Sequence, residues 1–216
     1  MTNLPDDTAL TQQGLAVKHG DGARILLIAC GAIAREVLAV IEANNWDHID
    51  LQCLPAILHN SPDAIPAAVE RKLLENKERY STTYLLYADC GTGGHLFDLC
   101  KNHRIEMLSG PHCYSFFEGN QTFAAHADDE FTAFYLTDFL VRQFDAFVIK
   151  PLGLDRHPEL RDSYFGHYEK LVYQAQTNDP ALDAKAQECA QRLGLEYERR
   201  QTGYGDLERE MKEWLG

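Results

Sequence analysis

Three of the six cysteines in this chain occur in the same setting. Cys30, Cys90 and Cys113 each follow an apolar run and lie beside or shortly after a glycine. Thiolates select zinc, iron or an iron–sulfur cluster, and three of them leave a fourth coordination position for water, a substrate or a histidine. The chain has no close Cys-x-x-Cys pair of the strong zinc type. We therefore expect either a shared zinc or iron site, or thiols that are simply buried in a core.

Cys90 is also a candidate nucleophile, because it opens a glycine-rich turn before an expected helix. The free amides at such a turn stabilise a thiolate or an oxyanion. His59 and His112, in neighbouring loops, are candidates for the base or for a fourth metal ligand. Small residues also let a cofactor approach the backbone. The candidates for that contact are Gly31, Gly91, Thr92, Gly93 and Gly94, although the turn matches no nucleotide-binding fingerprint.

Apolar runs alternating with helical patterns are expected to position these residues. Continuous apolar runs are typical of strands buried on both faces of a parallel sheet. The carboxyl ends of such strands share one edge, so the three thiols are expected to converge there. We predict an α/β fold in which a mainly parallel sheet is flanked by helices, as in a Rossmann-like three-layer sandwich. The expected strands are 25–30, 49–54, 83–90 and 104–108, and the expected helices are 32–44, 62–80 and a helix ending near 102.

The C-terminal part is expected to be largely helical. Thr132–Ile149 predicts a buried helix that grades into a strand near its end, and Pro158–Thr177 and Pro180–Leu193 predict two amphipathic helices. Leu195–Arg200 predicts a last strand, and Asp206–Trp214 a last helix. We expect residues 1–22 to form a flexible arm and residues 23–216 to form a single α/β domain.

Composition narrows the classes of function. The 216 residues carry a formal net charge of −13, which disfavours binding to nucleic acid or to anionic membranes. No apolar run approaches the roughly 20 residues of a transmembrane helix, and the N-terminus does not resemble a secretory signal. We expect a cytoplasmic protein whose cysteines are thiols rather than disulfides. Cys53, Cys100 and Cys189 lie inside expected elements, where a packed thiol is the simplest interpretation.

Several phrases of the sequence resemble one known family. They cover most of residues 23–216 and are Ala29-Cys30-Gly31-Ala32, Leu54-Pro55-Ala56, Leu58-His59-Asn60 with Pro62, Asp89-Cys90-Gly91-Thr92-Gly93-Gly94, Gly110-Pro111-His112-Cys113-Tyr114, Tyr135-Leu136-Thr137-Asp138-Phe139 and Thr202-Gly203-Tyr204-Gly205. In these phrases the chain is similar to the uncharacterised DUF1638 family. Members of that family are commonly encountered beside corrinoid-dependent methyltransferases that act on methylamines and betaines. The resemblance implies a one-carbon or methyl-transfer setting, with a corrinoid protein or methyltransferase as partner.

Three hypotheses of function follow. The first is a metal-binding protein, such as a metal-dependent methyltransferase or lyase with a small-molecule substrate, that uses Cys30, Cys90 and Cys113. The second is a metal-free enzyme in which Cys90 is the nucleophile and His59 or His112 the base. The third is a non-catalytic accessory or chaperone protein for a corrinoid methyltransferase. A corrinoid enters only indirectly, because the chain lacks the Asp-x-His-x-x-Gly run of base-off corrinoid carriers.

Overall fold

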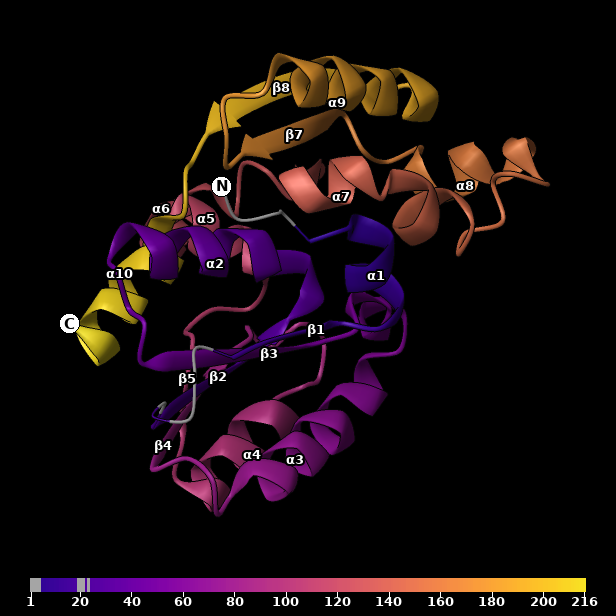
Figure 1. Ribbon diagram of the computed structural model, residues 1–216. Coiled ribbons are helices and arrows are strands. Elements are labelled where there is room, and N and C mark those ends of the chain that lie inside the picture. Colours follow the sequence, from indigo (N-terminus) through magenta and orange to yellow (C-terminus); the bar gives the residue numbers. More distant parts are fainter. Residues whose placement is uncertain (1–4, 19–21, 23) are drawn as a thin grey trace. The chain divides into compact units, whose positions relative to one another are not determined.

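The computed structural model describes residues 5–18, 22 and 24–216, and these form two compact units (Figure 1). The first unit contains residues 1–113 and 207–216, and the second contains residues 114–206. We expected a single domain over 23–216; each unit is described here by itself.

The first unit is built on a mixed sheet with the strand order β1-β3-β2-β4-β5. The strands β2, β3, β4 and β5 run parallel, and β1 joins the edge antiparallel to β3. Figure 1 shows α3 and α4 on one side of this sheet and α2 on the other. The elements are α1 (Asp7–Gln12), β1 (Leu15–Val17), β2 (Ile25–Cys30), η1 (Gly31–Ile33), α2 (Ala34–Ala43), β3 (Ile49–Leu54), η2 (Ala56–Asn60), η3 (Pro62–Ala64), α3 (Ile65–Asn76), β4 (Thr82–Leu86), α4 (His95–His103) and β5 (Glu106–Met107), with most of α10 (Gly205–Leu215).

The predicted α/β class and the mainly parallel sheet are confirmed in this unit. Residues 26–30 of β2 are buried, as expected for a strand that lies between β3 and β4 and has helices on both faces. The strand after the second helix is shorter than predicted, because β4 ends at Leu86 and the chain then continues in a loop to α4.

The described part of the expected arm, residues 5–18 and 22, contains one helix and one strand, and residues 1–4 and 19–21 of that arm lie outside the described residues. Its described residues form α1, whose N-cap Asp6 accepts a hydrogen bond from the Ala9 amide (2.9 Å), and the edge strand β1. Leu10 is fully buried, and Gly14 turns the chain toward β1 with a positive φ of 77°. A helix of six residues carries too few apolar positions for a recognisable period, and this explains why the pattern looked irregular.

The second unit contains a parallel sheet with the order β6-β7-β8. Its elements are α5 (Cys113–Glu118), α6 (Asn120–His126), β6 (Ala133–Thr137), α7 (Asp138–Arg142), the π-helical turn η4 (Asp145–Ile149), η5 (Pro158–Leu160), α8 (Arg161–Phe165), β7 (Lys170–Ala175), α9 (Pro180–Leu193) and β8 (Glu196–Gln201). One apolar cluster joins the sheet to α7 and α9 and includes Leu136, Val141, Tyr173 and Ala186.

Two of the helices expected in this part are wrong. Thr132–Ile149 contains β6 followed by α7 and η4, and Pro158–Thr177 contains η5 and α8 followed by β7. A short apolar run buried on both faces has no period that separates strand from helix. The predictions for 180–193, 195–200 and 206–214 are confirmed by α9, β8 and α10. No helix in the described ranges has the length and apolarity needed to cross a membrane.

Candidate functional site

The first sheet has a topological switch point between β2 and β4. The chain leaves β2 toward β3 on one side and returns through α3 to β4 on the other, so the helices after β2 and β4 lie on opposite faces (Figure 1). In open parallel sheets, ligands bind in the crevice at this point, outside the carboxyl ends of the strands. Cys30 ends β2, and Cys90 follows β4. Two of the predicted cysteines therefore belong to the position where this architecture binds ligands.

Local packing holds Cys30 at the end of β2. Its sulfur accepts a hydrogen bond from the Ala32 amide (3.5 Å) and so caps η1. Gly31 is tightly enclosed, since a Cβ atom there would lie 2.5 Å from the carbonyl oxygen of Leu10 and 2.9 Å from that of Leu54. We expected Gly31 to admit a cofactor. The close approach of α1 and β3 to the backbone accounts for glycine at this position, and the cofactor contact stays a prediction.

Backbone hydrogen bonds bring the loop of Cys113 beside Cys90. The Asp89 amide donates to the carbonyl of Gly110 (3.1 Å), and the Cys90 amide donates to the carbonyl of Pro111 (2.9 Å). These bonds join the loop after β4 to the loop after β5. Cys113 follows two residues later, half-buried at the start of α5.

Cys30, Cys90 and Cys113 form a group that we call the thiol cluster. Burial raises the pKa of Cys90 well above 9.0, and the neighbouring groups Cys113 and Cys30 raise it further. Burial also raises the pKa of Cys30, to about 11. All six cysteines lie in the described part of the chain and are thiols. At neutral pH the Cys30 and Cys90 side chains are therefore protonated.

The thiol cluster is not a preformed metal site. Among the residues that the structure describes, no three or more His, Cys, Asp or Glu side chains are arranged to hold a metal ion. Zinc binds its sulfur ligands at about 2.3 Å, which requires them to lie close together. The thiols would have to approach one another further to ligate zinc or iron, so metal binding stays a prediction.

The glycine-rich turn after Cys90 is organised by Asp89. The Asp89 carboxylate accepts hydrogen bonds from the Thr92 hydroxyl (2.9 Å), the Gly93 amide (3.2 Å) and the Gly94 amide (2.8 Å). Burial acts to raise the pKa of Asp89, but these hydrogen bonds outweigh it and lower the pKa. We expected the amides of Gly91, Thr92, Gly93 and Gly94 to face an oxyanion or a cofactor. In this conformation Asp89 itself takes the place of such an anion.

The turn also places Cys90 in an unusual backbone conformation. Cys90 has a φ of 51°, in the left-handed region that residues with a side chain seldom adopt. The following Gly91, Gly93 and Gly94 have φ values of 81°, 63° and 86°, which only glycine adopts at little cost. Strain of this kind at a non-glycine residue is common at functional sites.

The two predicted histidines are neighbours of each other. His59 lies in η2 after β3, and His112 directly precedes Cys113. Burial lowers the pKa of His59, and the nearby His112 lowers it further. Burial also lowers the pKa of His112, against the opposing effect of Asp89. Both imidazoles are therefore neutral at pH 7, as a general base or a metal ligand must be.

Tyr87 is a member of this site that the sequence did not indicate. It is 2% exposed, and its hydroxyl has no hydrogen-bond partner within the described residues. Burial, and then the neighbouring Cys30, Cys53 and Cys90, raise its pKa well above 10.0. Cys30 and the hydroxyl are close enough to shift each other's pKa, although they do not meet at hydrogen-bonding geometry. A tyrosine in an apolar run looks like core packing, so only its place beside Asp89 and Cys90 could have drawn attention to it.

The remaining cysteines separate into two kinds. Cys100 in α4 and Cys189 in α9 are buried in helices, which agrees with packing. Cys53 is buried in β3 and lies near the thiol cluster. Burial raises its pKa well above 9.0, and Cys30 is the largest further cause. The side chain thus contributes a fourth thiol to the surroundings of Cys30.

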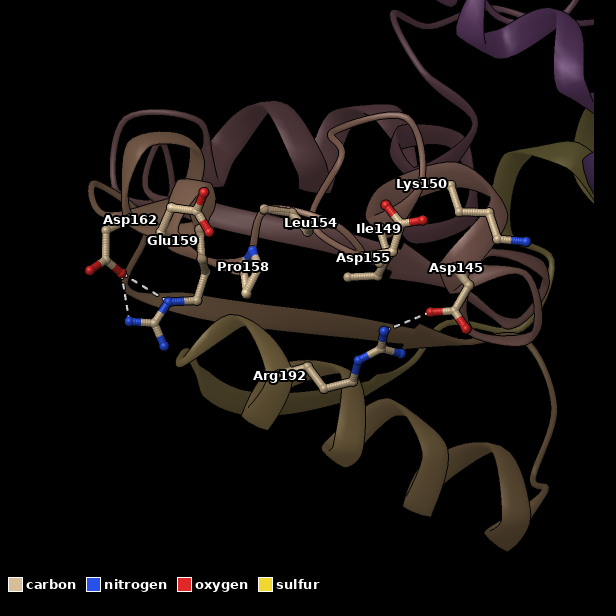
Figure 2. Close-up of a pocket in the computed structure, with 10 residues that line it drawn as sticks. Asp145, Ile149, Lys150, Leu154, Asp155, Pro158, Glu159, Asp162 and Arg192 are labelled. Atoms are coloured by element: carbon tan, nitrogen blue, oxygen red, sulfur yellow. Dashed lines mark hydrogen bonds and ion pairs between the residues drawn. The ribbon is translucent and has the colours of Figure 1, made fainter.

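The second unit has a separate cavity of about 490 Å³, beside α9 and the segment from η4 to α8 (Figure 2). Ile149, Leu154 and Pro158 are its nonpolar lining residues, and the other lining residues are Asp145, Lys150, Asp155, Glu159, Arg161, Asp162 and Arg192. Several of these charges neutralise one another, as Arg192 with Asp145 (2.7 Å) and Arg161 with Asp162 (2.5 Å). This cavity contains none of the residues predicted for the site.

Comparison with known proteins places the chain in a family. No curated protein and no solved structure matches it significantly. The matched region of the family includes Cys90, Cys113, His59 and His112, and it begins after Cys30. The model of the proteins of unknown function DUF1638 matches residues 53–211, which is most of the chain, and the protein therefore belongs to the DUF1638 family.

Proposed function

We propose that the thiol cluster binds a thiophilic metal ion, zinc or iron, and that the protein acts in one-carbon or methyl-transfer metabolism. The observation that carries the metal proposal is the position of three thiols, Cys30, Cys90 and Cys113, around the switch point of the first sheet. The metabolic setting, with a corrinoid protein or methyltransferase as partner, rests on the family resemblance alone.

The electrostatics of the cluster favour a soft cation. Ionised thiols at this place would repel one another and lose hydration, which is why the pKa of Cys90 is raised so far. A divalent cation reverses this balance, because thiolates are its ligands and the protons leave when it binds. A bound metal of this kind supplies a Lewis acid that activates a thiol or water. The neutral His59 and His112 are the predicted nitrogen donors.

Movement of the glycine-rich turn would allow Cys90 to approach the other thiols of the cluster. Nothing within 4 Å of Gly93 or Gly94 would meet a side chain there, so the turn has open space around it. Release of the Asp89 carboxylate from the Gly93 and Gly94 amides would free the turn that carries Cys90. This rearrangement is needed because the free protein has no ready set of ligands among its described residues.

Metal analysis of protein purified without oxygen tests the proposal. We expect wild-type protein to hold about one zinc or iron per chain, and Cys30→Ser, Cys90→Ser and Cys113→Ser each to lose most of it. Cys189→Ser is the matched control, because Cys189 is an equally buried thiol in the second unit. Metal-free wild-type protein, or equal retention in all four variants, would contradict a site at the thiol cluster.

A second candidate function is favoured by the backbone of Cys90. A nucleophile held in a strained turn between a strand and a helix is the arrangement of the nucleophile elbow in hydrolases. Cys90, with its φ of 51° between β4 and α4, has that placement. The raised pKa of Cys90 and the occupied turn amides weigh against this function. If it is correct, an electrophilic substrate analogue labels Cys90 in metal-free protein and Cys30→Ser leaves the labelling intact.

A further inference from the structure

The cavity of the second unit has the size of a small-molecule site. Its volume of about 490 Å³ falls within the roughly 300–1,000 Å³ that is typical of such sites. Ile149 and Leu154 line the cavity and are also buried members of the apolar cluster of this unit, so part of the wall is continuous with the core. Most of the other lining residues are charged. A molecule with both nonpolar and charged parts therefore fits this lining.

An unusual backbone forms one side of the cavity. In η4 the Lys150 amide donates to the Asp145 carbonyl (2.9 Å), and further along the chain the Leu154 amide donates to the Ile149 carbonyl (2.9 Å). Both bonds span five residues, where an α-helix spans four. Turns of this π type are rare and occur frequently at functional sites. All four residues line the cavity, so the backbone points to a ligand independently of the volume.

The positive charges that line the cavity differ in how they are paired. Arg192 pairs with Asp145 (2.7 Å), and Arg161 pairs with Asp162 (2.5 Å). The Lys150 ammonium, in contrast, has neither a hydrogen bond nor an ion pair within the described residues. Lys150 is therefore the lining cation that is available to a negatively charged group of a ligand.

Two lining carboxylates, those of Asp155 and Glu159, are not paired with a lining cation in the part of the chain that the structure describes. Asp155 lies 3.8 Å from Arg156, which does not line the cavity, and Glu159 contacts the His157 ring (3.2 Å). Figure 2 shows Glu159 and Lys150 toward opposite ends of the group of lining residues. The cavity thus presents a positive charge toward one end and a negative charge toward the other.

We propose that this cavity binds a small dipolar molecule whose amine and carboxylate are separated by a nonpolar chain, as in an ω-amino acid. The ligand carboxylate pairs with Lys150, the ligand amine pairs with Glu159, and the chain covers Leu154 and Pro158, which lie between them in Figure 2. Hydrogen bonds between charged groups are stronger than those between neutral groups. This inference is independent of the proposed function, because no residue of the thiol cluster lines the cavity.

The first arm of the test measures binding to the full-length protein by calorimetry. The probes are 4-aminobutanoate, 6-aminohexanoate and 8-aminooctanoate, which differ in the separation of their charges. We expect at least one of them to bind, one molecule per chain, with a dissociation constant of about 1 mM or lower. The alkanoate and the alkylamine of the same chain length each lack one charge and should bind about 5-fold more weakly or less well still. No binding of any probe, or equal binding of the singly charged analogues, would overturn the inference.

The second arm places the two ends of the ligand. Lys150→Met should weaken binding of the dipolar probe about 5-fold and leave binding of the alkylamine unchanged. Glu159→Gln should weaken binding of the dipolar probe and of the alkylamine, and leave binding of the alkanoate unchanged. Unchanged affinity of either variant for the dipolar probe would overturn the inference.

Lys101→Met and Glu188→Gln are the matched controls. Both remove the same charge from an exposed helical residue that does not line the cavity, and both should bind the dipolar probe as wild type does. A loss in the controls as large as that in Lys150→Met or Glu159→Gln would show that the probe responds to the overall charge of the protein, and would also overturn the inference.

Discussion

The two sheets differ in how the buried tyrosine hydroxyls near their carboxyl edges are paired. At the edge of the second sheet, Asp138 is fully buried and accepts hydrogen bonds from Tyr173, the Gln176 amide and Thr177. At the edge of the first sheet, Tyr87 keeps an unpaired hydroxyl beside protonated thiols. The hydrogen bonds that Asp138 accepts stabilise the fold of the second unit. A buried hydroxyl without a partner, such as that of Tyr87, needs a specific explanation, and we propose ligand binding at the edge of the first sheet.

We expect the largest loss of stability from the removal of Asp138 at the carboxyl edge of the second sheet. Asp138→Ala leaves four donors without their acceptor: the buried Tyr173 hydroxyl and Gln176 amide, and the part-buried amide and hydroxyl of Thr177. We expect the free energy of unfolding to fall by about 4 kcal/mol, measured by urea denaturation.

Asp179→Ala is the control for this change. Asp179 is an exposed N-cap that accepts one hydrogen bond from the Ala181 amide (2.9 Å), and its loss should cost only about 1 kcal/mol. If Asp138→Ala and Asp179→Ala lower the free energy of unfolding by similar amounts, the hydrogen bonds of Asp138 do not contribute the stability described here.

The raised pKa of Cys30 predicts that the protein loses stability at alkaline pH. Folding raises the pKa of Cys30 from 9.0 to about 11, so the folded protein holds this proton more tightly than the unfolded chain. The resulting contribution to stability, about 3 kcal/mol, is complete below pH 9 and is lost as the pH rises from about 9 to 11. Trp46 and Trp214 both belong to the first unit, so their fluorescence during urea unfolding at pH 8 and pH 10.5 reports on it.

Cys30→Ala should reduce this alkaline loss. Cys189→Ala, which removes a buried thiol of the second unit whose pKa is also raised to about 11, is the control and should leave the fluorescence-detected loss unchanged. If stability proves as high at pH 10.5 as at pH 8, Cys30 does not hold its proton as described.

A smaller effect in acid is expected from an ion-pair network on the second sheet. Hydrogen bonds from Arg200, helped by Lys170 and Tyr135, overcome burial and hold the pKa of Glu130 well below 4.5. The stability from this group is present above pH 4.5 and is lost as the pH falls below that value. We expect Glu130→Gln to cost about 2 kcal/mol at pH 7. The difference in the free energy of unfolding between pH 7 and pH 3 should also be smaller in Glu130→Gln than in wild type. Unfolding is followed by circular dichroism.

Glu196→Gln, an exposed carboxylate on β8, is the control for Glu130 and should change stability little at either pH. An identical pH dependence in wild type and Glu130→Gln would show that the network does not depress this pKa.

The smallest expected effect concerns two residues with a positive φ, Arg104 and Cys90. It tests whether the positive φ of Arg104, outside the candidate site, costs stability without affecting the site. Arg104 caps the C-terminus of α4 with a φ of 57°, close to the 51° of Cys90, but its side chain is exposed. Arg104→Gly should raise the free energy of unfolding by about 1 kcal/mol, as measured by thermal denaturation, and leave metal content unchanged. Arg104→Ala keeps the strained conformation and should not be stabilised. Equal stability of the two variants would exclude a cost from φ at this position.

The sequence predicts most of the first unit because its strands are long apolar runs bounded by turns. The bounds of β2 and β3 agree with those expected from Ile25–Cys30 and Ile49–Leu54. The position of the strand-end cysteines follows from the same pattern. In the second unit β7 was missed, because its run combines apolar residues with Lys170 and Gln174, whose partners come from other elements.

The details of the site depend on groups distant in sequence or on backbone conformation, and patterns do not report these. The hydrogen bonds from the turn amides to Asp89 depend on the φ values of the turn, which the residue pattern does not report. The orphaned hydroxyl of Tyr87 depends on which neighbours it lacks, which no local pattern encodes.

The place of β2 in the strand order has a consequence for the production of protein fragments. The family match begins at residue 53, whereas β2 at Ile25–Cys30 lies between β3 and β4. A fragment trimmed to residues 53–211 would lose β2 and all of β3 except its last two residues, so β4 would have no partner on that side. We therefore expect that a fragment of residues 53–211 does not fold by itself, because it lacks the middle of the first sheet.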